Sequence, residues 1–202
     1  MQSPRSPKRR FFGRVKNMKS VFIIHGSNGS KDAHWFPWLK RELESRGLQV
    51  FLPQFPIGDN QTLQNWLDTL EPMKENLEDS ILIGHSLGVP FILNVLNQWD
   101  IKVKAAFLVS GFFGHLEVED EPNIDDIAVR DFDWRKIREN CKYFYVTHSD
   151  NDPYVPLERA GELARNLNIE VTLIKGGKHF QGESGFKAFP QLLEKIEKIT
   201  KI

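Results

Sequence analysis

The pentapeptide Gly84-His85-Ser86-Leu87-Gly88 constrains this chain most, because of the segments on either side of it. The apolar run at residues 80–83 reads as a strand, and residues 89–96 read as a helix. A Gly-x-Ser-x-Gly turn between a strand and a helix forces its serine into a strained, exposed conformation. Side chains at the two glycine positions would collide with the strand or the helix. The context predicts Ser86 as a nucleophile; the alternative is a turn that is merely rich in small residues.

Short apolar runs alternate with longer amphipathic segments from Ser20 onward. The apolar runs are dense in Val, Ile, Leu and Phe, as strands covered on both faces are. This alternation predicts an α/β fold, a mostly parallel sheet of about six strands with helices on both faces. The predicted strands are residues 20–25, 48–52, 80–84, 103–109, 142–148 and 169–174. The predicted helices are residues 34–46, 61–77, 87–98, 132–139, 156–167 and 186–200.

The composition is that of one globular domain. A chain of 202 residues with 40% hydrophobic side chains can bury a single sizeable core. Basic and acidic residues balance at 27 each, so no global charge attracts nucleic acid or a membrane surface. The apolar runs are shorter than the roughly 18 residues that a membrane span needs. The single cysteine, Cys141, cannot form an internal disulfide or a Cys-based metal cluster, and a reducing, cytoplasmic setting is expected.

Residues 1–19 differ from the domain expected over residues 20–202. They contain seven Lys or Arg residues and no acidic residue. A mitochondrial-type presequence or a nucleic-acid-binding arm has this composition. The favoured alternative is a misassigned upstream start, with Met18 beginning the domain and a loosely held tail before it.

A second irregular segment, of about thirty residues, separates the predicted strands at 103–109 and 142–148. It begins with Gly111-Phe112-Phe113-Gly114 and carries an acidic stretch within residues 117–126. Loops at the carboxyl ends of the strands border the ligand site in open α/β sheets. The segment therefore has two equal interpretations, a short lid over the site or a solvated surface loop.

A serine hydroxyl becomes a nucleophile only when a base takes its proton and a third group orients that base. The acid candidate follows the predicted strand at 142–148. Asp152 is preferred because Val155-Pro156 ends its loop and starts the next helix. Asp150 is the competitor, two residues nearer the strand, and a third possibility is that both carboxylates only cap turns.

The base candidate is His179, which follows the last predicted strand. Gly176 and Gly177 let its loop bend back over the strand ends, and Phe180 can anchor it. His148 competes, but it lies on the same strand end as the acid, from which its ring is not expected to reach the nucleophile. Of the other histidines, two are expected to border the site and two to be structural or solvated: His25 and His85, then His34 and His115.

Two backbone amides are predicted to stabilise the oxyanion. One belongs to Leu87, at a helix N-terminus whose dipole favours negative charge. The other belongs to Ser27, after a glycine that allows close backbone approach. His25, Trp35, Trp38, Phe112 and Phe113 are candidate substrate-binding walls, with core packing as the alternative. No cofactor is expected, because the loop after the first strand lacks a phosphate-binding pattern and no metal-ligand spacing occurs.

The chain resembles the YdeN-like serine hydrolases, small α/β-hydrolases that include the retinoblastoma-binding-protein branch. The resemblance covers essentially residues 20–200, and its matching segments are Ile23–Ser27, Trp35–Leu39, Gly84–Gly88, Asp152–Pro156 and Gly177–Phe180. It implies a compact α/β-hydrolase fold without a large cap domain, in which Ser86, Asp152 and His179 are nucleophile, acid and base. Some members carry a Leu-x-Cys-x-Glu peptide for the retinoblastoma protein. That peptide is absent around Cys141, so this binding is not implied.

These features predict a serine hydrolase that cleaves small carboxylic esters through an acyl-enzyme in a shallow pocket. A small-molecule ester is the expected partner, with no nucleic acid and no membrane. The same residues suit an amidase or peptidase equally well. A binding protein that keeps the fold without catalysis is the rival from another class, and an intact triad argues against it.

Overall fold

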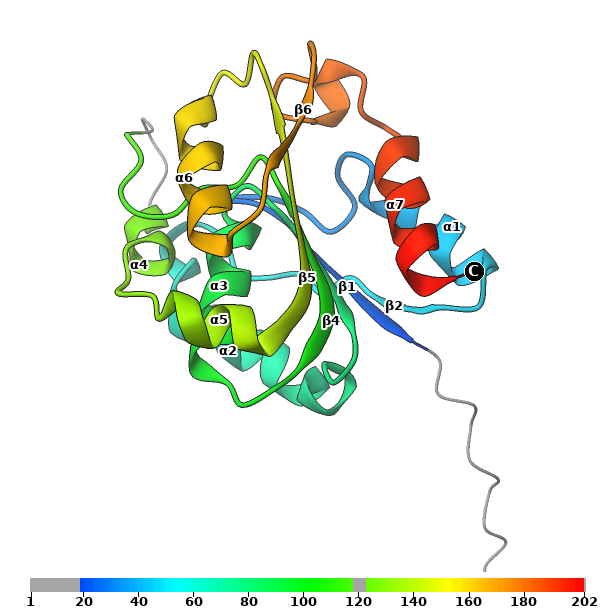
Figure 1. Cartoon of the computed structure of the whole chain (residues 1–202), viewed down its shortest axis with the longest axis horizontal. Coiled ribbons are helices and arrows are strands. Elements are labelled where there is room, and N and C mark those ends of the chain that lie inside the picture. Colours follow the sequence, from blue (N-terminus) through cyan, green and yellow to red (C-terminus); the bar gives the residue numbers. More distant parts are fainter. Residues whose placement is uncertain (1–18, 118–122, 202) are drawn as a thin grey trace, which may run out of the picture.

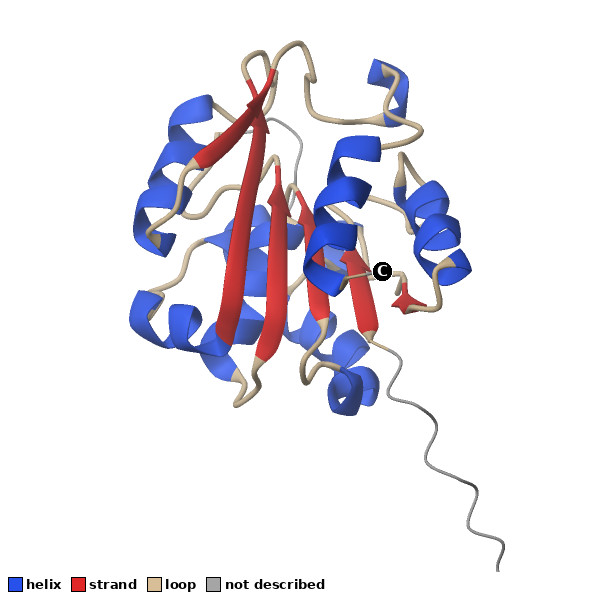
Figure 2. Cartoon of the chain, turned by 45° about the vertical axis from the view of Figure 1, so that its right-hand side comes forward, coloured by secondary structure: helices blue, strands red, loops and turns tan. Residues whose placement is uncertain are grey.

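The computed structural model describes residues 19–117 and 123–201 of the chain. Its framework is a six-stranded sheet in the order β2-β1-β3-β4-β5-β6, in which all neighbouring strands are parallel. Figure 2 shows the strands as a twisted layer between helices. The strands are β1 (Ser20–Ile24), β2 (Gln49–Phe51), β3 (Ile81–His85), β4 (Val103–Val109), β5 (Cys141–Ser149) and β6 (Val171–Ile174). The parallel sheet and all six predicted strands are confirmed, with ends shifted by one or two residues.

Helices cover both faces of the sheet (Figure 1). Helices α1 (Phe36–Ser45) and α7 (Pro190–Thr200) pack on one face. Five helices pack on the other: α2 (Leu63–Leu70), α3 (Gly88–Gln98), α4 (Ile124–Ala128), α5 (Trp134–Asn140) and α6 (Leu157–Leu167). Successive side chains of a strand point to opposite faces, so one strand serves both cores. In β1, Val21 and Ile23 join the α1/α7 core, whereas Phe22 and Ile24 join the other.

The helices differ from the prediction in two places. The helix expected over residues 61–77 ends at Leu70 and continues as a 3₁₀ segment, Glu71–Asn76. Pro72 explains the change, because its ring lacks an N–H and clashes with the preceding helical turn. The short helix α4 was not predicted, and it lies in the irregular segment after β4. Leu116 and Ile124, on either side of residues 118–122, both line the cavity described below.

The basic tail at 1–18 and the middle of the acidic stretch, 118–122, lie outside the described residues. Both predictions made for them remain predictions.

The strand order determines where a site can form. The chain winds outward from β1 to β2, then returns past β1 to build β3 through β6. Ligands of open α/β sheets bind where such a reversal separates the loops at the carboxyl ends of two neighbouring strands. Here those strands are β1 and β3, which lead into the loop at His25 and into Ser86.

Candidate active site

Ser86 follows β3 directly and has a backbone φ of 54°. This left-handed conformation is uncommon for a residue with a side chain and persists only where the surroundings hold it. The Ser86 amide donates to the carbonyl of Val109, at the end of β4, over 3.0 Å. A Cβ on Gly88 would lie 2.5 Å from the Ile24 oxygen, and a Cβ on Gly84 would lie 2.7 Å from the Gly88 oxygen. The steric requirement for both glycines, inferred from the sequence, is confirmed.

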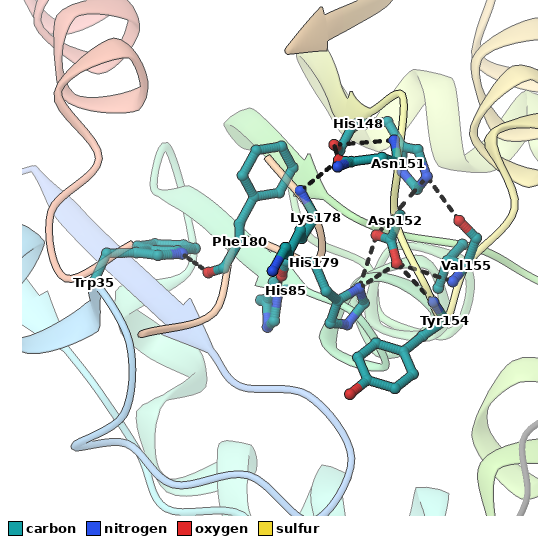
Figure 3. Close-up of polar contacts among 11 residues, drawn as sticks. Trp35, His85, His148, Asn151, Asp152, Tyr154, Val155, Lys178, His179 and Phe180 are labelled. Atoms are coloured by element: carbon teal, nitrogen blue, oxygen red, sulfur yellow. Dashed lines mark hydrogen bonds and ion pairs between the residues drawn. The ribbon is translucent and has the colours of Figure 1, made fainter. Parts of the chain in front are cut away.

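Asp152 and His179 form a hydrogen-bonded pair (Figure 3). His179 Nδ1 lies 2.8 Å and 3.0 Å from the two carboxylate oxygens, and the Asp152 side chain is 1% exposed. Because the carboxylate accepts from Nδ1, the pairing leaves Nε2 of the neutral ring with a lone pair. The Asp152 carboxylate also accepts the backbone N–H groups of Tyr154 and Val155, at 3.0 Å and 3.1 Å.

The environment keeps Asp152 ionised. Burial by itself raises the pKa of this carboxyl group, but the hydrogen bond and charge of His179 and the two backbone amides outweigh burial. The resulting pKa lies below the ordinary value for aspartate. An ionised acid beside the ring can hold its tautomer and stabilise the imidazolium.

The two competing side chains are hydrogen-bonded elsewhere, although His148 Nε2 also lies 3.9 Å from Asp152 Oδ2, farther than His179 Nδ1 at 2.8 Å. Asp150 accepts the backbone N–H of Gly176 at 2.7 Å and lies at the surface. His148 is fully buried, and its Nε2 donates to the Val155 carbonyl at 2.9 Å. The structure therefore pairs the acid at 152 with the imidazole at 179.

Contacts from three separate segments hold the His179 loop in place (Figure 3). The His85 ring donates from Nε2 to the His179 carbonyl at 2.8 Å, and the Trp35 indole donates to the Phe180 carbonyl at 3.1 Å. The Lys178 amide donates to the Asn151 side chain at 2.8 Å. Phe180 is fully buried, as its predicted anchoring role requires. Sequence reasoning assigned no contact of this kind to His85 or Asn151, since only folding brings their partners near.

Ser86 and His179 line one cavity of about 210 Å³ at the carboxyl edge of the sheet. No hydrogen bond joins the Ser86 hydroxyl to the His179 ring, although both residues border the same cavity. Such catalytic hydrogen bonds often shorten only when substrate is bound. The apolar part of the lining consists mainly of Leu87, Phe112, Leu116, Ile124 and Val155.

Both predicted oxyanion residues border this cavity. Leu87 immediately precedes α3, where the first amides of a helix have no intrahelical acceptor. A Cβ on Gly26 would lie 2.9 Å from the Ser86 Cβ, so the β1 loop approaches Ser86 as closely as a glycine allows. The fully buried Gln61 supports this loop, because its side chain donates to Ser27 Oγ at 2.8 Å.

The remaining predicted walls separate into two groups. Phe112 and His25 line the cavity, but both His25 nitrogens are engaged, Nδ1 with the Gly26 carbonyl and Nε2 with the Phe55 amide. Trp35 does not line the cavity: it is fully buried between aromatic rings of the α1/α7 core. The core-packing alternative therefore holds for Trp35, and Trp38 and Phe113, partly buried against the two cores, are not among the lining residues either.

His34 also differs from its prediction, but unlike Trp35 it lines the cavity. It was expected to be structural or solvated, yet its ring lines the cavity beside His85.

Despite these histidines, no group of three or more His, Cys, Asp or Glu side chains in residues 19–117 and 123–201 is placed to hold a metal ion. Within the same ranges, none of the helices combines the length and apolarity needed to cross a membrane.

Comparisons with known proteins agree with this architecture. A family model described as serine hydrolase matches residues 21–198. The chain is 35% identical over 175 residues to the YdeN protein of Bacillus subtilis (strain 168), covering 85% of this chain and 91% of that one. It is 27% identical over 165 residues to the serine hydrolase RBBP9 of Rattus norvegicus, covering 81% and 87%.

The crystal structure of the B. subtilis ydeN product superimposes with a TM-score of 0.86 at 32% identity, over 92% of this chain and all of that one. An extracellular α/β-hydrolase from a Paenibacillus species shares the fold at 16% identity, with a TM-score of 0.62 over 90% of this chain and 98% of that one. The compact α/β-hydrolase fold predicted from the sequence is confirmed.

Proposed function

Because the chain belongs to the serine hydrolase family, we propose that it cleaves small carboxylic esters through an acyl-enzyme on Ser86. The observation that carries the proposal is the Asp152–His179 pair, whose ring borders the same cavity as the Ser86 hydroxyl. A buried carboxylate, an oriented imidazole and a serine on a strained turn are the groups that acyl transfer needs.

In the proposed reaction, Ser86 Oγ attacks the ester carbonyl while His179 Nε2 takes the hydroxyl proton. Asp152 holds the ring and stabilises the imidazolium. The tetrahedral intermediate collapses when His179 gives its proton to the leaving alkoxide, which departs as the alcohol. Water then attacks the acyl-enzyme with His179 again as base, and the carboxylic acid leaves with Ser86 restored.

The amides of Ser27 and Leu87 are the proposed donors to the oxyanion. Loss of one such donor typically costs about 10²–10³ in rate. Ser27 lies on the β1 loop and Leu87 immediately precedes α3, and both border the cavity that Ser86 lines, which supports this assignment.

His85 supports the base without competing for its proton. Burial and the charge of His179 lower the pKa of His85 well below 6.5. The ring therefore stays neutral beside the imidazolium that forms during the reaction, and it keeps its N–H directed at the His179 carbonyl.

A fluorophosphonate probe tests the nucleophile. The wild-type chain should become labelled at Ser86, and Ser86→Ala should not. Ser45→Ala, the same change at an exposed position on α1, is the matched control and should label like wild type. An unlabelled wild-type chain would instead favour the non-catalytic, protein-binding alternative.

An ester and an anilide of the same acyl group distinguish the esterase from the amidase or peptidase alternative. Turnover of the ester that depends on Ser86 is the expected result. Turnover of the anilide alone would contradict the ester assignment while keeping the nucleophile.

A further inference from the structure

His34 presents a polar group to the cavity that the proposed reaction does not use. It precedes α1, has a φ of 54°, and its half-buried ring lines the same cavity as Ser86 and His179. The ring lies edge-on to His85, with centroids 5.5 Å apart. His34 and His179 thus both pack against the His85 ring, from segments far apart in the sequence.

A single hydrogen bond fixes which nitrogen of His34 carries its proton. The Gly182 amide donates to His34 Nδ1 at 3.0 Å, so Nδ1 is the acceptor and Nε2 carries the hydrogen. Burial, followed by the charge of His179, lowers the pKa of His34 and keeps the ring neutral.

No hydrogen bond links His34 Nε2 to any residue in the described ranges. The side chain of Gln181, next to Gly182, also lines the cavity and likewise has no hydrogen-bond partner among the described residues. These two polar side chains have no internal partner among the described residues, so their N–H groups can donate to a bound ligand.

The lining of the cavity combines residues from both faces of the sheet. His34 precedes α1, and its neighbour Phe36 belongs to the α1/α7 core. Phe112, Leu116 and Ile124 belong to the core on the opposite face of the sheet. A substrate in this cavity therefore meets His34 and Phe36 from the α1 side, and Phe112, Leu116 and Ile124 from the opposite face of the sheet.

The chemistry determines which half of an ester occupies which side. The base that deprotonates the nucleophile later protonates the leaving group, so the leaving group lies against the base. Tyr154, whose ring packs edge-on against His179, and His34 and Gln181 beside the His179 loop are polar residues of that part of the cavity, and the acyl group faces Phe112, Leu116 and Ile124.

We propose that His34 Nε2, with the Gln181 carboxamide beside it, binds a hydrogen-bond acceptor in the leaving group of the ester. The preferred substrates are then esters with an apolar acyl group and an alcohol part that carries an ether, hydroxyl or carbonyl oxygen. This inference rests on the proposed esterase function and adds the substrate class to it.

Butyl and 2-methoxyethyl esters of one short apolar acid provide the test. The two leaving groups have the same length and differ by one methylene replaced by an ether oxygen. The measured quantity is the ratio of kcat/KM for the methoxyethyl ester to kcat/KM for the butyl ester. Comparing this ratio between enzyme variants cancels the intrinsic difference in reactivity of the two esters.

His34→Asn is the informative variant. Asparagine tolerates the left-handed backbone, and its side-chain oxygen can accept the Gly182 amide in place of Nδ1. It is too short to place a donor where Nε2 lies. The ratio should fall about five-fold, the factor that a net hydrogen bond of about 1 kcal/mol contributes. His115→Asn, the same change at an exposed histidine, should leave the ratio as in wild type.

The outcomes separate this inference from the proposed function. If wild type hydrolyses both esters and His34→Asn keeps the wild-type ratio, the inference is wrong and the esterase stands. If His34→Asn does not fold, Gln181→Met decides in its place, with a drop in the ratio supporting the inference and an unchanged ratio overturning it. If wild type hydrolyses neither ester and Ser86 is not labelled, the proposed function fails and the inference fails with it.

Discussion

The contact between the Ser86 turn and β1 allows a quantitative test at Gly88. This glycine is the first residue of α3, and its φ is not in the left-handed region. Replacing it by alanine would place a Cβ 2.5 Å from the Ile24 carbonyl oxygen and 2.9 Å from the His25 carbonyl oxygen. Both atoms belong to the backbone of β1 and its loop, so neither can rotate away.

Two opposing terms set the size of the effect. Alanine favours a helix over glycine by about 1 kcal/mol. Overpacking a well-filled site typically costs about 1–3 kcal/mol, and contact with backbone atoms places Gly88→Ala near the upper end. The net loss of unfolding free energy should be about 2 kcal/mol. In a chain of this size, 1 kcal/mol shifts Tm by about 2–4 °C, so Tm should fall by about 4–8 °C.

Gly161→Ala is the matched control, because the substitution is identical and the surroundings are open. Gly161 lies inside α6, and the nearest atom to its added Cβ is the end of the Arg165 side chain at 3.5 Å. Only the higher helix propensity of alanine applies there, so Tm should rise by about 2–4 °C. Thermal unfolding followed by circular dichroism measures both variants. A Gly88→Ala chain as stable as Gly161→Ala would refute the steric account of the turn.

Three further predictions concern the acid, the base loop and pH. Asp152→Asn should lower kcat about 10⁴-fold, as removal of a triad acid does, whereas Asp150→Asn should have a small effect. Equal losses of kcat in steady-state assays would contradict the pairing of Asp152 with His179. His85→Phe keeps an aromatic ring but removes the donor to the His179 carbonyl. Urea unfolding should show a loss of unfolding free energy of about 1–3 kcal/mol, and kcat should fall. A variant with unchanged stability and kcat would show that His85 does not hold the His179 loop. Burial lowers the pKa of both His85 and His148 from 6.5, so the unfolded chain binds protons that the folded chain does not. Stability should be greatest above about pH 6.5 and fall as the pH decreases below it, with a weaker fall in His85→Phe; a urea midpoint that rises on acidification would contradict this.

The sequence by itself determined the parts of this protein that depend on local sterics and periodicity. The strained turn at Ser86 was readable because Gly84 and Gly88 stand between an apolar run and a helix, and a clash between neighbouring segments needs no distant information. The strands were readable because side chains buried on both faces leave continuous apolar runs. Asp152 and His179 could be chosen because parallel strands bring their carboxyl ends to one edge, which makes position after a strand informative.

Only the tertiary structure decided which side chains face the cavity. Trp35 and His34 are adjacent in sequence, yet one is buried in the core and the other borders Ser86. The direction of each ring depends on long-range partners, the Phe180 carbonyl for Trp35 and the Gly182 amide for His34. Those partners lie 145 and 148 residues away along the chain. No local pattern encodes such contacts, because they exist only after α1 and the His179 loop have packed together at the same edge of the sheet.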